Sequence, residues 1–497
     1  EMTQIYYLDE NNKEQVLEIN DATISNTSFT NAGINKTQIT KIVFGSSCKN
    51  IEYEIFGWCK SIERLEIPNS SKITYVYNPF VGCTGLKEVV LGEIGNPIKD
   101  TNMKLFYTCT QNDLTMKVYV EDGVTSLAGA PWGANNSTIE YYSAKTGELV
   151  NLIIGNKYQG NQEIDWTEIP NADKITKINS SAFRGCTNLA LTSLPSKITK
   201  IETYAFNSCK NLKIDKIPEE ITQIGYEAFA WCTSIKRLEI PNAGNINFAN
   251  SSFVGCTGLE EVILGKVGKP VKNLNSSMFY VCNQNNLTIR VYVEDEVTSL
   301  AGAPWGANNS TIEYYSAKTG ELVNLIIGNK YQGNQEIDWT EIPNADKITK
   351  INSSAFRGCT NLALTSLPSK ITKIETYAFN SCKNLKIDKI PEEITQIGYE
   401  AFAWCTSIKR LEIPNAGNIN FANSSFVGCT GLEEVILGKV GKPVKNLNSS
   451  MFYVCNQNNL TIRVYVEDEV TSLAGAPWGA TKATIEYYSA TTGEKIK

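Results

Sequence analysis

Cysteine is the residue of this 497-residue chain with the greatest capacity for chemistry, because thiolates act as nucleophiles, metal ligands and disulfide partners. Thirteen of the fourteen cysteines close a Phe-x-x-Cys pattern, and between Cys186 and Cys282 successive cysteines lie 23, 23, 24 and 26 residues apart. Such regularity favours a small apolar plug with a weak donor, so we predict free, buried thiols at these positions. Bridges between adjacent repeats would need specific Cβ directions. Cys48 lies outside the pattern and is the thiol we expect to be most reactive.

Histidine is absent, which excludes His-assisted nucleophilic triads, His-containing zinc sites and imidazole acid–base catalysis. Neighbouring acids such as Glu219 and Glu220 point to opposite faces of a strand and rarely converge. Lys266, Lys269 and Lys272 lie in a Gly/Pro-containing loop that we interpret as solvated, although it could bind anionic glycans. We expect no catalytic activity, no cofactor and no metal site, and a glycan-active enzyme is the remote alternative.

The eight tryptophans follow the same repeats and allow two interpretations. One is a sugar-binding platform, and the other is a cover for an open end of a stacked structure, which needs capping. We favour the cover. The tryptophans are Trp58, Trp231 and Trp404 before a cysteine, Trp132, Trp305 and Trp478 in Ala-Pro-Trp-Gly-Ala, and Trp166 and Trp339 near module starts.

The elements that position these residues repeat at two scales. Residues 151–307 recur letter for letter at 324–480, and residues 46–150 follow the same register with substitutions. We predict three modules: a shortened module one at 1–142 with degenerate first repeats, module two at 143–315 and the near-identical module three at 316–497. Each shorter repeat indicates a strand, a turn, a compact segment and a second strand. One such turn cannot bury its apolar face, so stacking must build the core.

The predicted core of module two consists of the Phe and Cys residues of five successive repeats. These are Phe183, Cys186, Phe206, Cys209, Phe229, Cys232, Phe253, Cys256, Phe279 and Cys282. In module one, Phe29 with Ala32 is interpreted as a decayed repeat. The stretches at 138–154 and 311–327 have two β-rich arms around a Lys-Thr-Gly turn, and we predict that these hairpins join the modules through ordered contacts.

The unit I-x-x-I-x-x-x-A-F-x-x-C-x-x-L-x-x-[LV]-x-[IL]-[PG] resembles the BspA-type leucine-rich repeats of surface proteins. The segment at 291–315 is similar to the Trp-containing cap that closes such solenoids. The resemblance covers nearly the whole chain and implies a repeat solenoid of β-rich leucine-rich-repeat modules, each with a cap and a β-hairpin junction. It also implies a secreted or surface-displayed protein, and many members of the family act as adhesins.

Charge and hydropathy agree with such a protein. The net charge is −6 from 46 basic and 52 acidic residues, which disfavours nucleic acid as a partner. No apolar run approaches the length of a membrane span, so we expect no direct membrane insertion. The opening EMTQIYYLDE lacks a basic region followed by an apolar one, so we expect the export signal and anchor to lie outside this chain.

The predicted binding surface is the solvent face of the strands. In IKRLEIP, Ile235, Leu238 and Ile240 are expected to point inward and Arg237 and Glu239 outward. The candidate binding residues are Lys216, Arg237, Glu239 and Glu261 and their copies Lys389, Arg410, Glu412 and Glu434. We predict an adhesin that binds a protein or glycan of a host or neighbouring cell, or further copies of itself. A stalk or filament-forming spacer is the alternative.

Overall fold

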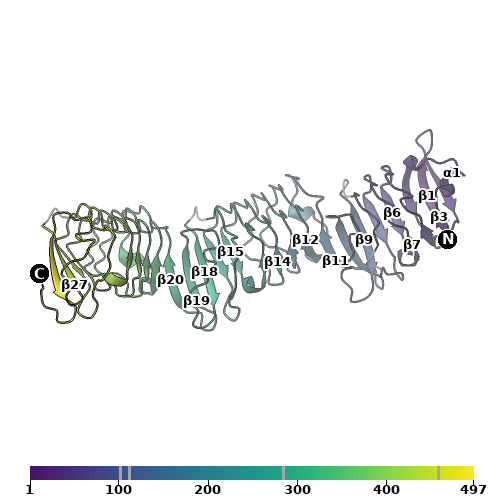
Figure 1. The fold of residues 1–497 in the computed structure, drawn as a ribbon. Coiled ribbons are helices and arrows are strands. Elements are labelled where there is room, and N and C mark those ends of the chain that lie inside the picture. Colours follow the sequence, from purple (N-terminus) through teal and green to yellow (C-terminus); the bar gives the residue numbers. More distant parts are fainter. Residues whose placement is uncertain (100–102, 110–112, 283–285, 456–458, 497) are drawn as a thin grey trace. The chain divides into compact units, whose positions relative to one another are not determined.

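The computed structural model describes residues 1–99, 103–109, 113–282, 286–455 and 459–496 (Figure 1). They form two compact units, one of residues 1–236 and 245–256 and the other of residues 237–244 and 257–497. The division into three modules stays a prediction, and the module names are kept below only for the residue ranges given above.

The first unit contains a 12-stranded and a three-stranded sheet, and in both the neighbouring strands are mostly parallel. In spatial order the large sheet consists of β16 (Asn247–Phe248), β14 (Gln223–Ile224), β13 (Lys200–Ile201), β12 (Ile175–Ile178), β11 (Leu149–Ile154), β10 (Thr138–Ser143), β9 (Thr115–Val120), β8 (Glu88–Leu91), β6 (Arg64–Ile67), β4 (Ile39–Val43), β1 (Thr3–Leu8) and β2 (Glu14–Ile19). The small sheet consists of β3 (Thr23–Ile24), β5 (Asn50–Ile51) and β7 (Thr74–Tyr75).

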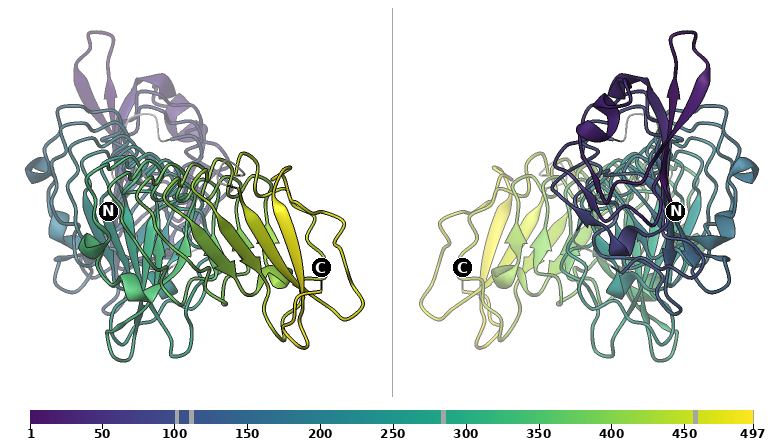
Figure 2. Two further views of the ribbon diagram at one scale, coloured as in Figure 1. Left: turned by 90° about the vertical axis from the view of Figure 1, so that its left-hand side faces the viewer. Right: turned by 90° about the vertical axis from the view of Figure 1, so that its right-hand side faces the viewer.

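The second unit contains a nine-stranded and a four-stranded sheet. The larger sheet consists of β15 (Arg237–Ile240), β17 (Glu261–Leu264), β18 (Thr288–Val293), β19 (Thr311–Ser316), β20 (Leu322–Ile327), β21 (Ile348–Ile351), β22 (Lys373–Ile374), β23 (Gln396–Ile397) and β25 (Asn420–Phe421). The smaller sheet consists of β24 (Arg410–Ile413), β26 (Glu434–Leu437), β27 (Thr461–Val466) and β28 (Thr484–Ser489), which lie side by side at the yellow end of Figure 2.

Helices are short and lie between the strands. They are α1 (Thr27–Thr30) and the 3-10 turns η1 (Lys36–Gln38), η2 (Ser70–Lys72), η3 (Trp166–Glu168), η4 (Ala172–Lys174), η5 (Ala243–Asn245), η6 (Trp339–Glu341), η7 (Ala345–Lys347) and η8 (Ala416–Asn418). Three of these turns begin with a capping box, as at Asp338, whose side chain accepts from the Thr340 amide.

Stacked turns confirm the predicted solenoid and its inward register. Leu411 and Ile413 of β24 are fully buried, whereas Arg410 and Glu412 between them reach solvent. Parallel pairing places Arg410 opposite Glu434 of β26 in the next turn. Each turn therefore covers the apolar face of its neighbour, which a single turn could not bury.

The core is a column of phenylalanine rings with one ring from each turn. All ten predicted core residues of module two are fully buried. In module three, Phe379 stacks on Phe402 with ring centroids 5.3 Å apart, and Phe402 stacks on Phe426 at 5.1 Å. Phe29 is buried and meets Phe56 edge-on at 5.3 Å, so the degenerate first repeat still supplies a ring to the column.

The cysteine beside each ring does more than fill space. All fourteen cysteines are free and buried, which confirms the prediction for the thirteen repeat cysteines and extends it to Cys48. The thiol of Cys405 donates to the carbonyl of Phe379 in the preceding turn at 3.2 Å, and that of Cys429 donates to Phe402 at 3.1 Å. The predicted apolar plugs with a weak donor thus use that donor across neighbouring turns. Each of these carbonyls also accepts from a backbone amide of its own turn, Phe379 from Cys382 and Phe402 from Cys405, so the thiol adds a second hydrogen bond.

The hairpin between modules transfers the sheet from one core to the next. β19 pairs antiparallel with β20, so Glu313 lies opposite Leu325, and β20 pairs parallel with β21. Leu325 and Ile327 pack in the core of module three, on the face opposite to the buried Tyr314. The sheet therefore has its core on one face before the hairpin and on the other face after it. These backbone bonds confirm ordered contacts at the junction (Figure 1).

Candidate functional site

The solvent face of β24, β26, β27 and β28 is a ladder of alternating charges. Arg410 lies 2.9 Å from Glu412 on its own strand and 3.3 Å from Glu434 on the next. Arg463 then pairs with Glu434 and, at 3.2 Å, with Glu486. Because parallel pairing fixes these side chains at the strand spacing, each Glu between two strands is held from both sides.

The same ladder recurs on β15, β17, β18 and β19. Arg237 contacts Glu239 at 2.9 Å and Glu261 at 3.4 Å, and Arg290 contacts Glu313 at 3.0 Å. The predicted residues of this strand face are thus brought together in both copies within the second unit. Lys216, in the first unit, is exposed.

Module one has a related ladder on β6, β8 and β9. Arg64 lies 3.1 Å from Glu66 and also pairs with Glu88, whose other oxygen lies 2.9 Å from the Lys117 ammonium. These two cations lower the pKa of the Glu88 carboxyl against the opposing effect of its burial. The ladder therefore recurs although a lysine here replaces the arginine of the other copies.

Beside the ladder of module three the surface is hollowed by about 400 Å³. Lys389 lies at its edge, bridged to Glu412 through the backbone. Glu392 accepts from Lys439 at 2.6 Å and from Lys442 at 2.9 Å, and these hydrogen bonds lower the pKa of its carboxyl to about 2. The charged side chains of the hollow other than Lys389 are thus all in ion pairs.

Sequence reasoning missed this second cluster. Lys439 and Lys442 are the module-three copies of Lys266 and Lys269, a loop that we interpreted as solvated. They lie 47 and 50 residues from Glu392 along the chain, so no local pattern links the three side chains. Only the stacking of turns brings the loop and the acid together.

Comparison with known proteins bears on the repeated turns. The pattern of the BspA type leucine rich repeat region matches in six copies, over residues 4–127, 153–295 and 326–468. The chain belongs to the BspA-type leucine-rich-repeat family. No curated protein matches it significantly.

Solved structures of other leucine-rich-repeat proteins are similar at low identity. A leucine-rich repeat protein from Bacteroides ovatus is 18% identical, with 88% of this chain and 93% of that chain covered and a TM-score of 0.29. A leucine rich cell surface protein from Faecalibacterium prausnitzii is 15% identical, with 97% and 93% covered and a TM-score of 0.21. The pneumococcal vaccine antigen PcpA is 15% identical, with 98% and 92% covered and a TM-score of 0.28.

Within these BspA-type repeats the tryptophans have two different environments. Trp478 is fully buried under the last turn, and its indole N–H donates to the Leu447 carbonyl at 2.6 Å. Trp404 is 42% exposed and lies flat on Gly428, where a Cβ would come within 2.3 Å of the ring. The Ala-Pro-Trp-Gly-Ala tryptophans thus cover a core, whereas those before the cysteines lie at the surface.

The cysteines of the repeats are poorly suited to chemistry. Burial raises the pKa of Cys48, Cys186 and Cys359 to about 11 and that of the deeper thiols further. Cys48, which we expected to be the most reactive thiol, is therefore not distinguished from the repeat cysteines.

Acidic and thiol side chains also do not gather into clusters in the described part of the chain. Among the described residues, no three His, Cys, Asp or Glu side chains gather as metal ligands would. No helix in that part of the chain is long and apolar enough to cross a membrane.

Proposed function

We propose that this chain is a non-catalytic adhesin of a cell surface that binds a protein or glycan of a host or neighbouring cell through its charged strand faces. The observation that supports the proposal is the ladder itself, which recurs on three sets of strands. Side chains already held by neighbours on both strands lose little freedom when a partner binds, which lowers the entropic cost of recognition. Repeated ladders on one chain would add avidity.

The test is a binding screen of the full chain against extracellular-matrix proteins and glycans. For any partner found, the double variant Arg237→Ala and Arg410→Ala should weaken binding about tenfold or more, because central interface arginines often dominate affinity. The matched control is Lys236→Ala with Lys409→Ala, which removes the neighbouring exposed cations. Equal binding by both variants would contradict recognition through the ladder.

A second candidate function is a stalk or filament-forming spacer. It is favoured by the junction hairpin, whose arms are hydrogen-bonded to strands of the preceding and the following module. A fixed junction repeated down a longer chain would produce a rod or superhelix. Small-angle scattering of the full chain tests this, and a profile that needs a broad ensemble of module orientations would contradict it.

A further inference from the structure

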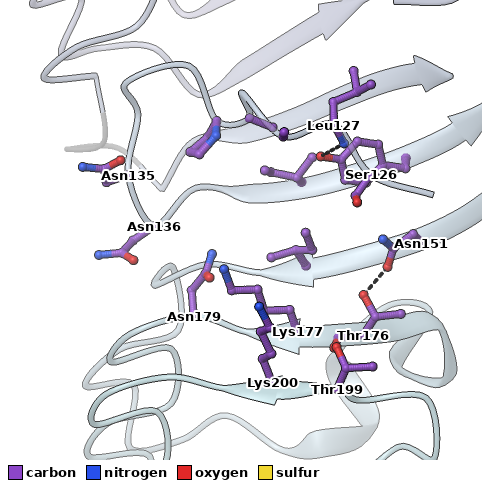
Figure 3. Close-up of a pocket in the computed structure, with 16 residues that line it drawn as sticks. Ser126, Leu127, Asn135, Asn136, Asn151, Thr176, Lys177, Asn179, Thr199 and Lys200 are labelled. Atoms are coloured by element: carbon purple, nitrogen blue, oxygen red, sulfur yellow. Dashed lines mark hydrogen bonds between the residues drawn. The ribbon is translucent and has the colours of Figure 1, made fainter. Parts of the chain in front are cut away.

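A polar cleft lies at the junction hairpin, away from the charged ladder. In the first unit, one wall is the cap loop that contains Leu127, Ala130 and Pro131, and the other is formed by the outer face of β11, β12 and β13 (Figure 3). The cleft has a volume of about 530 Å³, and the copy in the second unit has about 700 Å³. Both fall within the range of small-molecule binding sites.

Hydrogen bonds fix both walls before any ligand arrives. The Leu127 amide in the cap loop donates to the Tyr141 hydroxyl of β10 at 3.2 Å. The Asn151 side chain of β11 donates to the Thr125 carbonyl of the loop and accepts from the Thr176 hydroxyl of β12 (Figure 3). The loop and three strands are thus joined into one preorganised site.

The charge in the cleft is positive. Lys177 and Lys200 are register partners on β12 and β13, so their ammonium groups extend side by side from neighbouring strands (Figure 3). The positive charge of Lys177 is balanced by Glu202, whose carboxylate lies 3.7 Å from the Lys177 ammonium. Lys200 is in no ion pair within the described part of the chain, and neither is its copy Lys373. Each cleft therefore offers one lysine for an anionic group.

The remaining lining consists mostly of neutral polar groups and short apolar side chains. Asn135, Asn136 and Asn179 supply amides, and Thr199 adds a hydroxyl near the lysines. Leu127 and its neighbours in the cap loop supply an apolar wall. A ligand that matches this lining has several hydroxyls, an apolar face and one negative charge.

We propose that the junction cleft binds an acidic saccharide, with its carboxylate on Lys200 or Lys373 and its hydroxyls on the asparagine amides. A phosphate group is typically bound by bidentate arginines or by several backbone amides that converge on it. Neither arrangement lines this cleft. The third cap carries Thr481 and Lys482 in place of the asparagine pair. The chain therefore binds two acidic saccharides, one at each junction.

Titration calorimetry of the full chain with 3′-sialyllactose and digalacturonate, with lactose as the neutral match, tests the proposal. We expect two sites per chain and at least tenfold weaker binding of lactose. Lys200→Gln with Lys373→Gln should weaken sialyllactose binding about tenfold, because a charge-assisted hydrogen bond is lost. The control Lys213→Gln with Lys386→Gln removes two exposed lysines outside the clefts and should leave affinity unchanged.

A second, nearly isosteric pair keeps the test independent of the lysines. Asn136→Asp with Asn309→Asp preserves shape, and Asp tolerates the left-handed backbone found at both positions, with φ of 67°. The added charge should repel sialyllactose and leave lactose binding unchanged. The proposal is overturned if neither acidic sugar binds, if both cleft variants retain full affinity, or if a diglutamate peptide competes as well as sialyllactose. Arg237→Ala with Arg410→Ala should leave this binding intact, so failure here is distinct from failure of the strand-face proposal.

Discussion

The phenylalanine column and the charged ladder both run across stacked turns, yet their interactions differ in kind. Phe402 lies between Phe379 and Phe426 with no exposed surface, and water cannot replace these contacts. Arg410 is 46% exposed, and water can hydrate it whenever its partners move away. The repeat therefore sets the geometry of both faces, whereas the buried phenylalanine face contributes most of the folding free energy.

The sharpest test of this contrast uses pH, because burial raises the pKa of most repeat cysteines. Thiols that ionise near pH 8.5 when unfolded stay protonated in the folded chain, where the pKa of Cys359 is about 11. The folded state then holds more protons, so stability is fully present below about pH 8.5 and falls as pH rises toward 11. For a thiol such as Cys359 we expect a loss of between about 1 and 2 kcal/mol at pH 10.

Denaturant unfolding between pH 7 and 10, in the presence of a reductant, measures this loss. Alkylation of the native chain at pH 8 should label few cysteines, and alkylation in denaturant should label all fourteen. A free energy of unfolding that stays constant up to pH 10 would show that the thiols are not desolvated.

The next largest effect should come from the column itself. Phe402→Ala removes a fully buried ring and should cost about 3–5 kcal/mol. Because a solenoid is stabilised mainly by nearest-neighbour interfaces, the loss should be local. Hydrogen exchange should rise over the turns that contain Phe379 and Phe426 and stay unchanged over module one. A uniform rise across the chain would contradict nearest-neighbour coupling.

A smaller effect should follow from the thiol hydrogen bond. Cys405→Ala removes one of the two hydrogen bonds that the Phe379 carbonyl accepts, the other being from the Cys382 amide, and should cost about 0.5–1.5 kcal/mol. The comparison variant is Cys405→Ser, which keeps a donor. Local hydrogen exchange should report both variants, and equal protection in wild type and Cys405→Ala would mean that the thiol only fills space.

The smallest effect should come from the ladder. Arg410→Ala breaks two exposed ion pairs and should change the free energy of unfolding by less than about 0.5 kcal/mol. Lys409→Ala, which touches neither acid of the ladder, is its control. If Arg410→Ala destabilised module three as much as Phe402→Ala, the contrast between the two faces would be wrong.

The repeating part of this protein is predictable from its sequence alone. Phe-x-x-Cys at nearly constant spacing predicted the buried column, and the alternation in Arg-Leu-Glu-Ile predicted which side chains face solvent. These inferences succeeded because burial follows local periodicity, which each turn repeats. The predicted ladder residues of module three were also brought together, since parallel register follows from stacking.

The way in which distant segments meet depends instead on how the turns pack in three dimensions. The pairing of Glu392 with Lys439 depends on how far two loops project, and no period encodes that distance. The change of core face at β20 follows from the antiparallel turn, which places Leu325 opposite Glu313. The junction cleft exists because that change sets a cap loop against Lys177 and Lys200, which belong to later turns. Sequence periodicity predicts the features that recur in every turn. Contacts that form only at a junction depend on chain direction and packing.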